Sequence, residues 1–263
     1  MTARGARVAA SLTCLVAAVL TSCGERSPDR PGGPGGPGGS DTTDTTAPAP
    51  GLPVTVVDGE VLVSCGGTAP GWPPSAMVDG ITPPVPVAEI EAALSAAPVA
   101  HALRRDWKVL AADADELTLA LGTWREDGPA RDAQYLVLEP EADGWRASNG
   151  GSCWRLSPVL DADAIWVQVD ASVAVAGDAT EVAVDVKETA CAGARDPLPH
   201  LAQPMLTADD EAVTVYWTSE SPGAAGCPEN PTARTTLTLD EPLGDRPLLD
   251  GSRWPPALIG QDE

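Results

Sequence analysis

The chain of 263 residues contains no phenylalanine, only two tyrosines and only two lysines. Eight tryptophans must therefore supply most of the bulky aromatic packing. A tryptophan platform for sugars is one interpretation of these residues, and packing in the core and over the sheets is the more general one. The fourteen arginines, with abundant Ala, Gly, Pro, Val and Asp, are typical of coding from a high-GC genome and carry no functional argument.

Positive charge is also scarce. Lysine and arginine together number 16 against 38 acidic residues, which gives a formal net charge of −22. A strongly acidic chain is repelled by nucleic acids and by anionic lipid headgroups. We therefore expect no nucleic-acid partner and no electrostatic docking to a membrane, while cations or basic partners remain compatible with this charge.

Several signatures of catalysis are missing from the sequence. Its two histidines, His101 and His200, are not accompanied by a Gly-x-Ser-x-Gly elbow, and no glycine-rich loop follows a strand and opens a helix. A Ser/His/Asp triad remains open because sequence spacing does not restrict it. The pattern favours a protein that is not an enzyme and that holds no cofactor or metal.

Long apolar runs are limited to the N-terminus. Arg4 and Arg7 precede a segment, 8–20, that carries no charge, which is the pattern of a secretory signal. This run is shorter than the ~20 apolar residues that a membrane-spanning helix needs. It ends in Leu20-Thr21-Ser22-Cys23, and these four residues resemble the lipobox of bacterial lipoprotein precursors.

In that family the lipobox cysteine receives a diacylglyceryl group, and the signal is cut just before it. The resemblance implies a signal peptide over residues 1–22 and an acylated Cys23 that fixes the protein to the cell membrane, facing the extracytoplasmic side. A diacylglyceryl group meets the requirement of two chains for stable anchoring. Two arginines leave with the signal, so the mature charge would be −24. The alternative is an ordinary signal peptide with an incidental cysteine.

Residues 23–53 are rich in Pro, Gly and Thr and cannot bury a core. We expect this segment to be a disordered tether. About thirty residues of Gly-rich coil span roughly 30 Å on average and about 100 Å when extended. The segment is predicted to hold a folded body away from the membrane.

The folded body is predicted to be mostly antiparallel β, with an α+β module over 54–157 and an all-β, sandwich-like module over 158–263. The first module is expected to have one main helix over 87–105, interrupted at Pro98, followed by an antiparallel meander. Its strands are expected near 107–110, 116–121, 134–138 and 145–154, with a hairpin turn at Asp143-Gly144.

In the second module, alternating apolar residues predict half-buried strands at 165–175, 181–187, 213–217 and 234–240. Val182, Val184 and Val186 lie on one face of the second of these. Residues 239–251 are predicted to turn into an edge strand. This last piece is similar to a closing segment of actinobacterial lipoproteins, and the resemblance implies no activity.

Four cysteines remain after Cys23, and an even number in an exported chain predicts two disulfides. Three pairings are possible. The position of two cysteines in each half favours Cys65–Cys153 and Cys191–Cys227. A metal site is the alternative, but no close pair such as Cys-x-x-Cys is present.

Three acidic clusters, at 113–116, 161–163 and 209–211, are the remaining candidates for chemistry. Paired carboxylates are able to act in glycoside hydrolysis or to bind Ca²⁺, but each cluster precedes a predicted strand, where Asp commonly forms turns. We expect a non-catalytic envelope lipoprotein that binds another protein or a glycan. The alternative is a carboxylate-based, glycosidase-like envelope hydrolase with a cleft between the two modules. Ligand capture for uptake is disfavoured because the alternating βα pattern of solute-binding lobes is missing.

Overall fold

The computed structural model describes residues 51–67, 70–98, 106–161, 163–171, 175–223 and 226–260. The chain divides into two units, Met1–Thr43 and Asp44–Glu263, and every described residue belongs to the second. The signal segment, Cys23 and His101 lie outside the described residues. Within the described part of the chain, no helix is long and apolar enough to cross a membrane.

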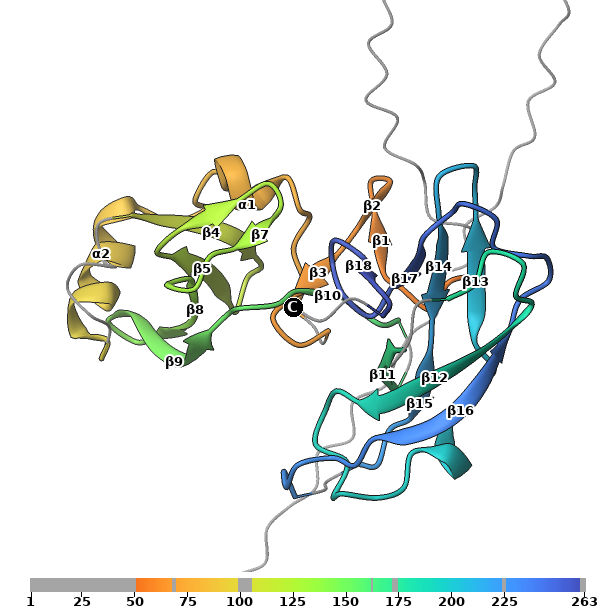
Figure 1. Ribbon diagram of the computed structural model, residues 1–263. Helices are drawn as coiled ribbons and strands as arrows, with labels where there is room; N and C mark the ends of the chain where they lie inside the picture. The colour runs from red at the N-terminus through yellow and green to blue at the C-terminus, as the bar shows by residue number, and fades with distance from the viewer. Residues whose placement is uncertain are drawn as a thin grey trace, which may run out of the picture. The chain divides into compact units, whose positions relative to one another are not determined.

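Four antiparallel strands form a sheet in the order β4-β5-β8-β9, which follows the chain (Figure 1). These strands are Trp107–Ala112 (β4), Leu117–Leu121 (β5), Gln134–Glu141 (β8) and Gly144–Ser152 (β9). Helix α2, Val87–Ala96, packs on one face, where Ile90 and Leu94 are fully buried among leucines of β5 and β8. Glu141 pairs with Gly144 across the hairpin that joins β8 to β9.

Strand β5 lies inside this sheet and is buried at all five positions. Leu117, Leu119 and Leu121 face the α2 cluster, as their alternation predicts. Ala120, on the other face, belongs to a second buried cluster that contains Trp72 and Trp124. Both faces of the sheet are therefore covered at β5, whereas most positions of the edge strand β9 are exposed.

The helix predicted over 87–105 is interrupted before Pro98, as expected. Helix α2 ends at Ala96, and Ala97 has extended dihedral angles of −70° and 148°. Pro98 explains this end, because a proline disfavours helical geometry at the residue before it. Residues 99–105 lie outside the described part of the chain.

Short elements surround the first sheet. They are β1 (Val56–Val57), β2 (Glu60–Val61), β3 (Val63–Ser64), α1 (Ala76–Asp79), β6 (Trp124–Arg125), β7 (Gly128–Pro129) and β10 (Ser157–Pro158). Strands β1 and β2 pair across Asp58-Gly59, whose φ angles of 52° and 85° suit the two-residue hairpin turn expected of this dipeptide. Strand β10 pairs with β3, and this pairing joins residues 63–64 to residues 157–158.

The second half contains two further four-stranded sheets (Figure 1). One has the order β15-β11-β12-β16, with strands Thr218–Glu220, Ala164–Asp170, Glu181–Glu188 and Ala233–Thr238. The other has the order β13-β14-β17-β18, with strands Met205–Ala208, Val213–Tyr216, Leu248–Asp250 and Ala257–Leu258. One buried cluster combines valines of β11, β12 and β14 with leucines of β16 and β17, so the two sheets share a core.

The closing segment differs from its prediction as an edge strand. Strand β17 lies between β14 and β18, and it runs parallel to β14, with Val213 beside Leu248. Leu248 and Asp250 are both buried there. Strand β11 ends at Asp170, and residues 172–174 of the long strand or pair of strands predicted over 165–175 lie outside the described part of the chain.

Disulfides join Cys65 to Cys153 and Cys191 to Cys227, which is the pairing that the distribution of cysteines favours. The prediction of disulfide bonds is confirmed, as is the mostly antiparallel β architecture. Disulfides persist in oxidising compartments and are rare in the cytosol. The two bonds therefore indicate an extracytoplasmic environment.

Candidate functional site

Two of the three acidic clusters form turns rather than sites. Asp113 Oδ1 accepts a hydrogen bond from the Asp115 backbone N at 2.8 Å. Asp209 Oδ1 accepts from the backbone N atoms of Ala212 and Glu211, both at 2.8 Å, and these bonds lower the pKa of Asp209. Both arrangements are Asx turns. The third cluster, 161–163, contains residue 162, which lies outside the described part of the chain.

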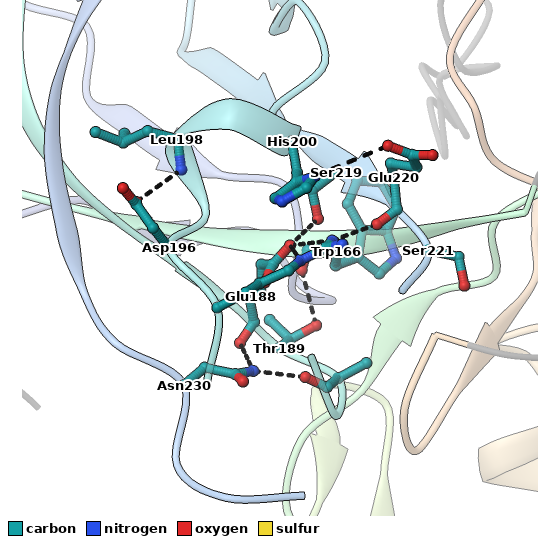
Figure 2. A network of polar contacts seen from close by, with 12 residues as sticks. Trp166, Glu188, Thr189, Asp196, Leu198, His200, Ser219, Glu220, Ser221 and Asn230 are labelled. Atoms are coloured by element: carbon teal, nitrogen blue, oxygen red, sulfur yellow. Dashed lines mark hydrogen bonds and ion pairs between the residues drawn. The ribbon is translucent and has the colours of Figure 1, made fainter. Parts of the chain in front are cut away.

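A buried polar network surrounds Glu188 at the end of β12 (Figure 2). Glu188 continues the inward-facing positions of Val184 and Val186, so its side chain is only 1% exposed. Arg195 donates to both carboxylate oxygens, from Nε at 3.1 and 3.2 Å and from Nη2 at 2.6 Å. Ser219 Oγ donates to Oε1 at 2.7 Å. The carboxylate is therefore held by three hydrogen-bonding groups of two side chains.

These bonds decide the charge of Glu188. Burial acts to raise the pKa of Glu188, but the hydrogen bonds from Arg195 and Ser219 outweigh it and leave the pKa below its ordinary value. The carboxylate is consequently ionised at neutral pH and neutralised by the guanidinium. Such a group has no proton to give as a general acid.

The network also fixes the segment that follows β12. Asn230 Nδ2 donates to the carbonyl oxygens of Glu188 at 2.9 Å and Ala190 at 2.5 Å. Thr189 Oγ1 donates to the Trp166 carbonyl oxygen at 3.0 Å (Figure 2). Arg195 reaches the Glu220 carbonyl oxygen as well. With the Cys191 disulfide in the same segment, these contacts indicate a structural role for the network.

Ser219 is not placed to act as the nucleophile of a Ser/His/Asp triad. A nucleophilic serine needs a base within hydrogen-bond reach. Ser219 is 1% exposed and donates to Glu188 rather than to a histidine. His200, in the 3-10 helix Leu198–His200, has its Nδ1 3.8 Å from Glu220 Oε2, a carboxylate on the exposed side (Figure 2).

A cavity of about 150 Å³ lies beside the Cys65–Cys153 disulfide. Its lining comes from β3, β5, β8, β9 and the loop that follows β3: Ser64, Cys65, Gly66, Pro70, Trp72, Thr118, Tyr135, Val137 and Asn149. Three of these residues, Ser64, Trp72 and Thr118, are at most 4% exposed. Their side-chain polar atoms make no hydrogen bond to any residue that the structure describes.

Asp250 is a second buried carboxylate, at the end of β17. Its oxygens accept hydrogen bonds from the backbone N of Ser252 at 3.0 Å and from Ser252 Oγ at 2.9 Å, and Arg253 Nε lies 3.8 Å away. Burial outweighs these contacts and raises the pKa of Asp250 from 3.8 to about 6. The Asp250 carboxyl group is therefore partly protonated at pH values just below neutral.

Asp250 should make the protein less stable as the pH rises from about 4 to about 6. In this window the unfolded chain releases the proton while the folded chain keeps it, so the free energy of unfolding falls by about 3 kcal/mol and then levels off. Urea unfolding of the wild type and of Asp250→Asn between pH 4 and pH 7 measures this. The variant should gain stability relative to the wild type across the window. A pH-independent difference between the two would contradict the expectation.

Sequence reasoning placed charges only on the exposed face of β12 and so missed Glu188. The signal was present, because Glu188 shares the even-numbered positions of Val182, Val184 and Val186. It also missed the cavity residues Ser64 and Thr118, for which alternation gives no signal in a strand buried on both faces.

No group of three or more His, Cys, Asp or Glu side chains is placed to hold a metal ion in the part of the chain that the structure describes. The described residues thus present a structural network around Glu188, in which Asn230 Oδ1 has no partner, and a cavity whose lining contains the three other unsatisfied polar groups. Comparison of the chain with protein-family models, with curated proteins and with solved structures finds no match.

Proposed function

We propose that this protein is a lipid-anchored, extracytoplasmic lipoprotein whose folded body binds another component of the cell envelope and has no catalytic activity. The observation that carries the proposal is the pairing of the body's four cysteines in two disulfides. Thiols that are all oxidised in this way imply export. Export in turn fits a signal over 1–22 and acylation of Cys23, the residue at which the lipobox resemblance ends.

The rest of the molecule supports a binding role. Residues 23–53 supply a tether long enough to hold the body away from the bilayer. The body combines an α+β module over 54–157 with a sandwich-like module over 158–263 in this proposal. The buried carboxylate with the most polar contacts, Glu188, is neutralised by Arg195 and serves the fold. The cavity of about 150 Å³ that Ser64, Trp72 and Thr118 line is the place that we assign to a ligand.

Replacing the lipidation site should release the protein from the membrane. The full chain with Cys23→Ala, made in its native host, is expected to move from the membrane fraction to the soluble fraction, or to accumulate as the uncut precursor. Each methylene of the two acyl chains that is buried in the bilayer contributes about 0.8 kcal/mol to membrane binding, and an acidic protein surface does not replace this contribution. Cell fractionation and intact-mass measurement check this.

Cys14→Ala is the matched control, because Cys14 lies within the segment that would be removed. It should leave fractionation and mature mass unchanged. Membrane association of Cys23→Ala equal to that of the wild type, or a mature mass without acyl groups, would overturn the proposed anchor.

A further inference from the structure

We propose that the cavity beside the Cys65–Cys153 disulfide binds one neutral sugar unit of an envelope glycan. This inference deepens the proposed function by naming the class of ligand, and it rests on that function for where the protein meets the glycan. Three features support it: polar atoms without partners on residues of the lining, the lack of charge among the described lining residues, and aromatic walls.

Three residues of the cavity lining each carry a buried polar group. Ser64 is 4% exposed, and Trp72 and Thr118 are each 2% exposed. Ser64 Oγ, Trp72 Nε1 and Thr118 Oγ1 have no hydrogen-bond partner among the described residues. Burial, with the nearby carboxylates, raises the pKa of Glu116, and the Thr118 hydroxyl beside it offsets only part of that rise. Buried polar groups without partners are rare in native proteins. Three of them around one cavity indicate that something else satisfies them.

The types of these groups define what a ligand must offer. The indole N–H of Trp72 only donates, whereas the hydroxyls of Ser64 and Thr118 both donate and accept. Asn149, an exposed residue of the lining, accepts from the Gly150 backbone N at 2.8 Å through its Oδ1, and its side-chain amide supplies two further donors. A ligand hydroxyl, which accepts from Trp72 and donates to a protein hydroxyl, satisfies this set.

Among the residues that the structure describes, none in the lining is charged. This is notable in a chain of net charge −22, where acidic residues number 38. An anionic ligand would find no lysine or arginine in the lining, and a cationic ligand would find no carboxylate. The cavity therefore favours a neutral ligand.

Two aromatic side chains, Trp72 and Tyr135, give the cavity apolar walls. The Trp72 ring is held by Trp124, edge to face, with centroids 6.1 Å apart and an interplanar angle of 74°. Trp124 is fixed in turn, because its Nε1 donates to the Leu121 carbonyl oxygen at 3.0 Å. Apolar walls with a few placed polar groups suit a small ligand. A sugar ring, with C–H faces and a rim of hydroxyls, combines both kinds of contact.

The size of the cavity fits this assignment. Its volume of about 150 Å³ exceeds that of one water, which takes ~30 Å³ in the liquid. Gly66 and Asn149 in the lining are exposed, so the cavity opens to solvent on their side. A single sugar unit would enter here while the rest of a glycan stays outside. A group of ordered waters would also satisfy the polar atoms, and the experiment must separate the two.

The test is ligand-observed saturation-transfer NMR on the full-length protein, in a detergent whose headgroup is not a sugar. The probes are glucose, galactose, mannose, arabinose and N-acetylglucosamine, each titrated separately, with glucuronic acid as the charged comparison. We expect saturable binding of at least one neutral sugar, and at least tenfold weaker binding of glucuronic acid than of glucose.

Two variants test whether the sugar binds in this cavity, and a third variant is their control. Trp72→Phe removes the indole N–H and should weaken binding at least fivefold. Gly66→Leu should block the opening at little cost to the fold, because a Cβ atom at this exposed position has no atom within 4 Å beyond its chain neighbours. Trp154→Phe, a tryptophan that is 76% exposed and outside the lining, should bind as the wild type does. Thermal unfolding confirms that each variant is folded.

Two results would overturn the sugar site. One is the lack of saturable binding by every neutral sugar, which would leave ordered waters as the partners of the polar atoms. The other is equal binding by the wild type and a folded Gly66→Leu variant. Neither depends on acylation, so the sugar site fails independently of the anchor that Cys23→Ala tests.

Discussion

Replacing Cys65 and Cys153 together with serine is expected to lower the free energy of unfolding by about 4–5 kcal/mol. The bond closes a loop of 88 residues, and in the chain-entropy model a loop of this length removes that much conformational freedom from the unfolded chain. The loop contains helix α2 and all of the sheet β4-β5-β8-β9, so without the bond most of the first half is no longer cross-linked in the unfolded chain. Denaturant unfolding of the double variant, beside the wild type, measures the loss.

The second disulfide is the internal comparison for this result. Cys191 and Cys227 are 36 residues apart, and the same model gives about 4 kcal/mol for their removal. The first double variant should therefore be the less stable of the two by a fraction of a kcal/mol. If loss of the Cys65–Cys153 bond lowers the free energy of unfolding less than loss of the Cys191–Cys227 bond does, loop entropy is not what stabilises the first half.

The first disulfide also bears on the proposed ligand site, because Cys65 lines the cavity and Ser64 precedes it. Strand β3 has only two residues, Val63 and Ser64, and its partner β10 is as short. Such a strand needs a fixed end to hold a polar side chain in a cavity. We therefore expect sugar binding and stability to fall together in the Cys65→Ser, Cys153→Ser variant, whereas Gly66→Leu should lower binding alone.

What could be predicted from the sequence follows from periodicity and cysteine count. The alternation of Leu117, Leu119 and Leu121 locates β5, and the valines of β12 locate the core of the second half. The turn at Asp58-Gly59 and the end of α2 before Pro98 follow from the backbone preferences of single residues. In each case the signal is local in the chain.

The features that escaped prediction depend on contacts between distant segments. Nothing local shows that β17 inserts beside β14 and pairs with it in parallel. Likewise, Glu188 accepts a hydrogen bond from Ser219, 31 residues away in the chain. Ser64 and Thr118 line the same cavity only because the fold brings their strands together. Alternation identifies an inward position, but it does not identify the partner that makes a buried acid tolerable there.

The partner of Glu188 can be removed to measure how much it contributes. Arg195→Met is expected to lower the free energy of unfolding at neutral pH by about 3 kcal/mol, because it leaves a buried carboxylate without its counter-charge. The Glu188 side chain is 1% exposed, but that of Arg195 is 19% exposed, which places the loss at the lower end of the range of about 3–5 kcal/mol for such pairs. Urea unfolding at pH 7 measures it.

The control is Arg234→Met, which removes the same side chain from an exposed pair. Arg234 donates to Asp185 through two bonds of 2.9 Å, a geometry similar to that of Arg195 on Glu188, but the Arg234 side chain is 63% exposed. Exposed pairs are screened by solvent and contribute little. This variant should unfold close to the wild type, so that burial rather than pairing explains the difference between the two substitutions.

The pH dependence separates the loss of a charge partner from the loss of packing. In the wild type the pKa of Glu188 is lowered, so its contribution is present above the ordinary carboxyl pKa and is lost as the pH falls through the lower, folded value. Without Arg195, burial is the largest effect left, and Glu188 should take up a proton on mild acidification. The deficit of Arg195→Met should therefore shrink toward pH 4, and adding Glu188→Gln should restore most of the stability at pH 7. A deficit that stays constant with pH and persists in the double variant would mean that Arg195 acts through its packing alone.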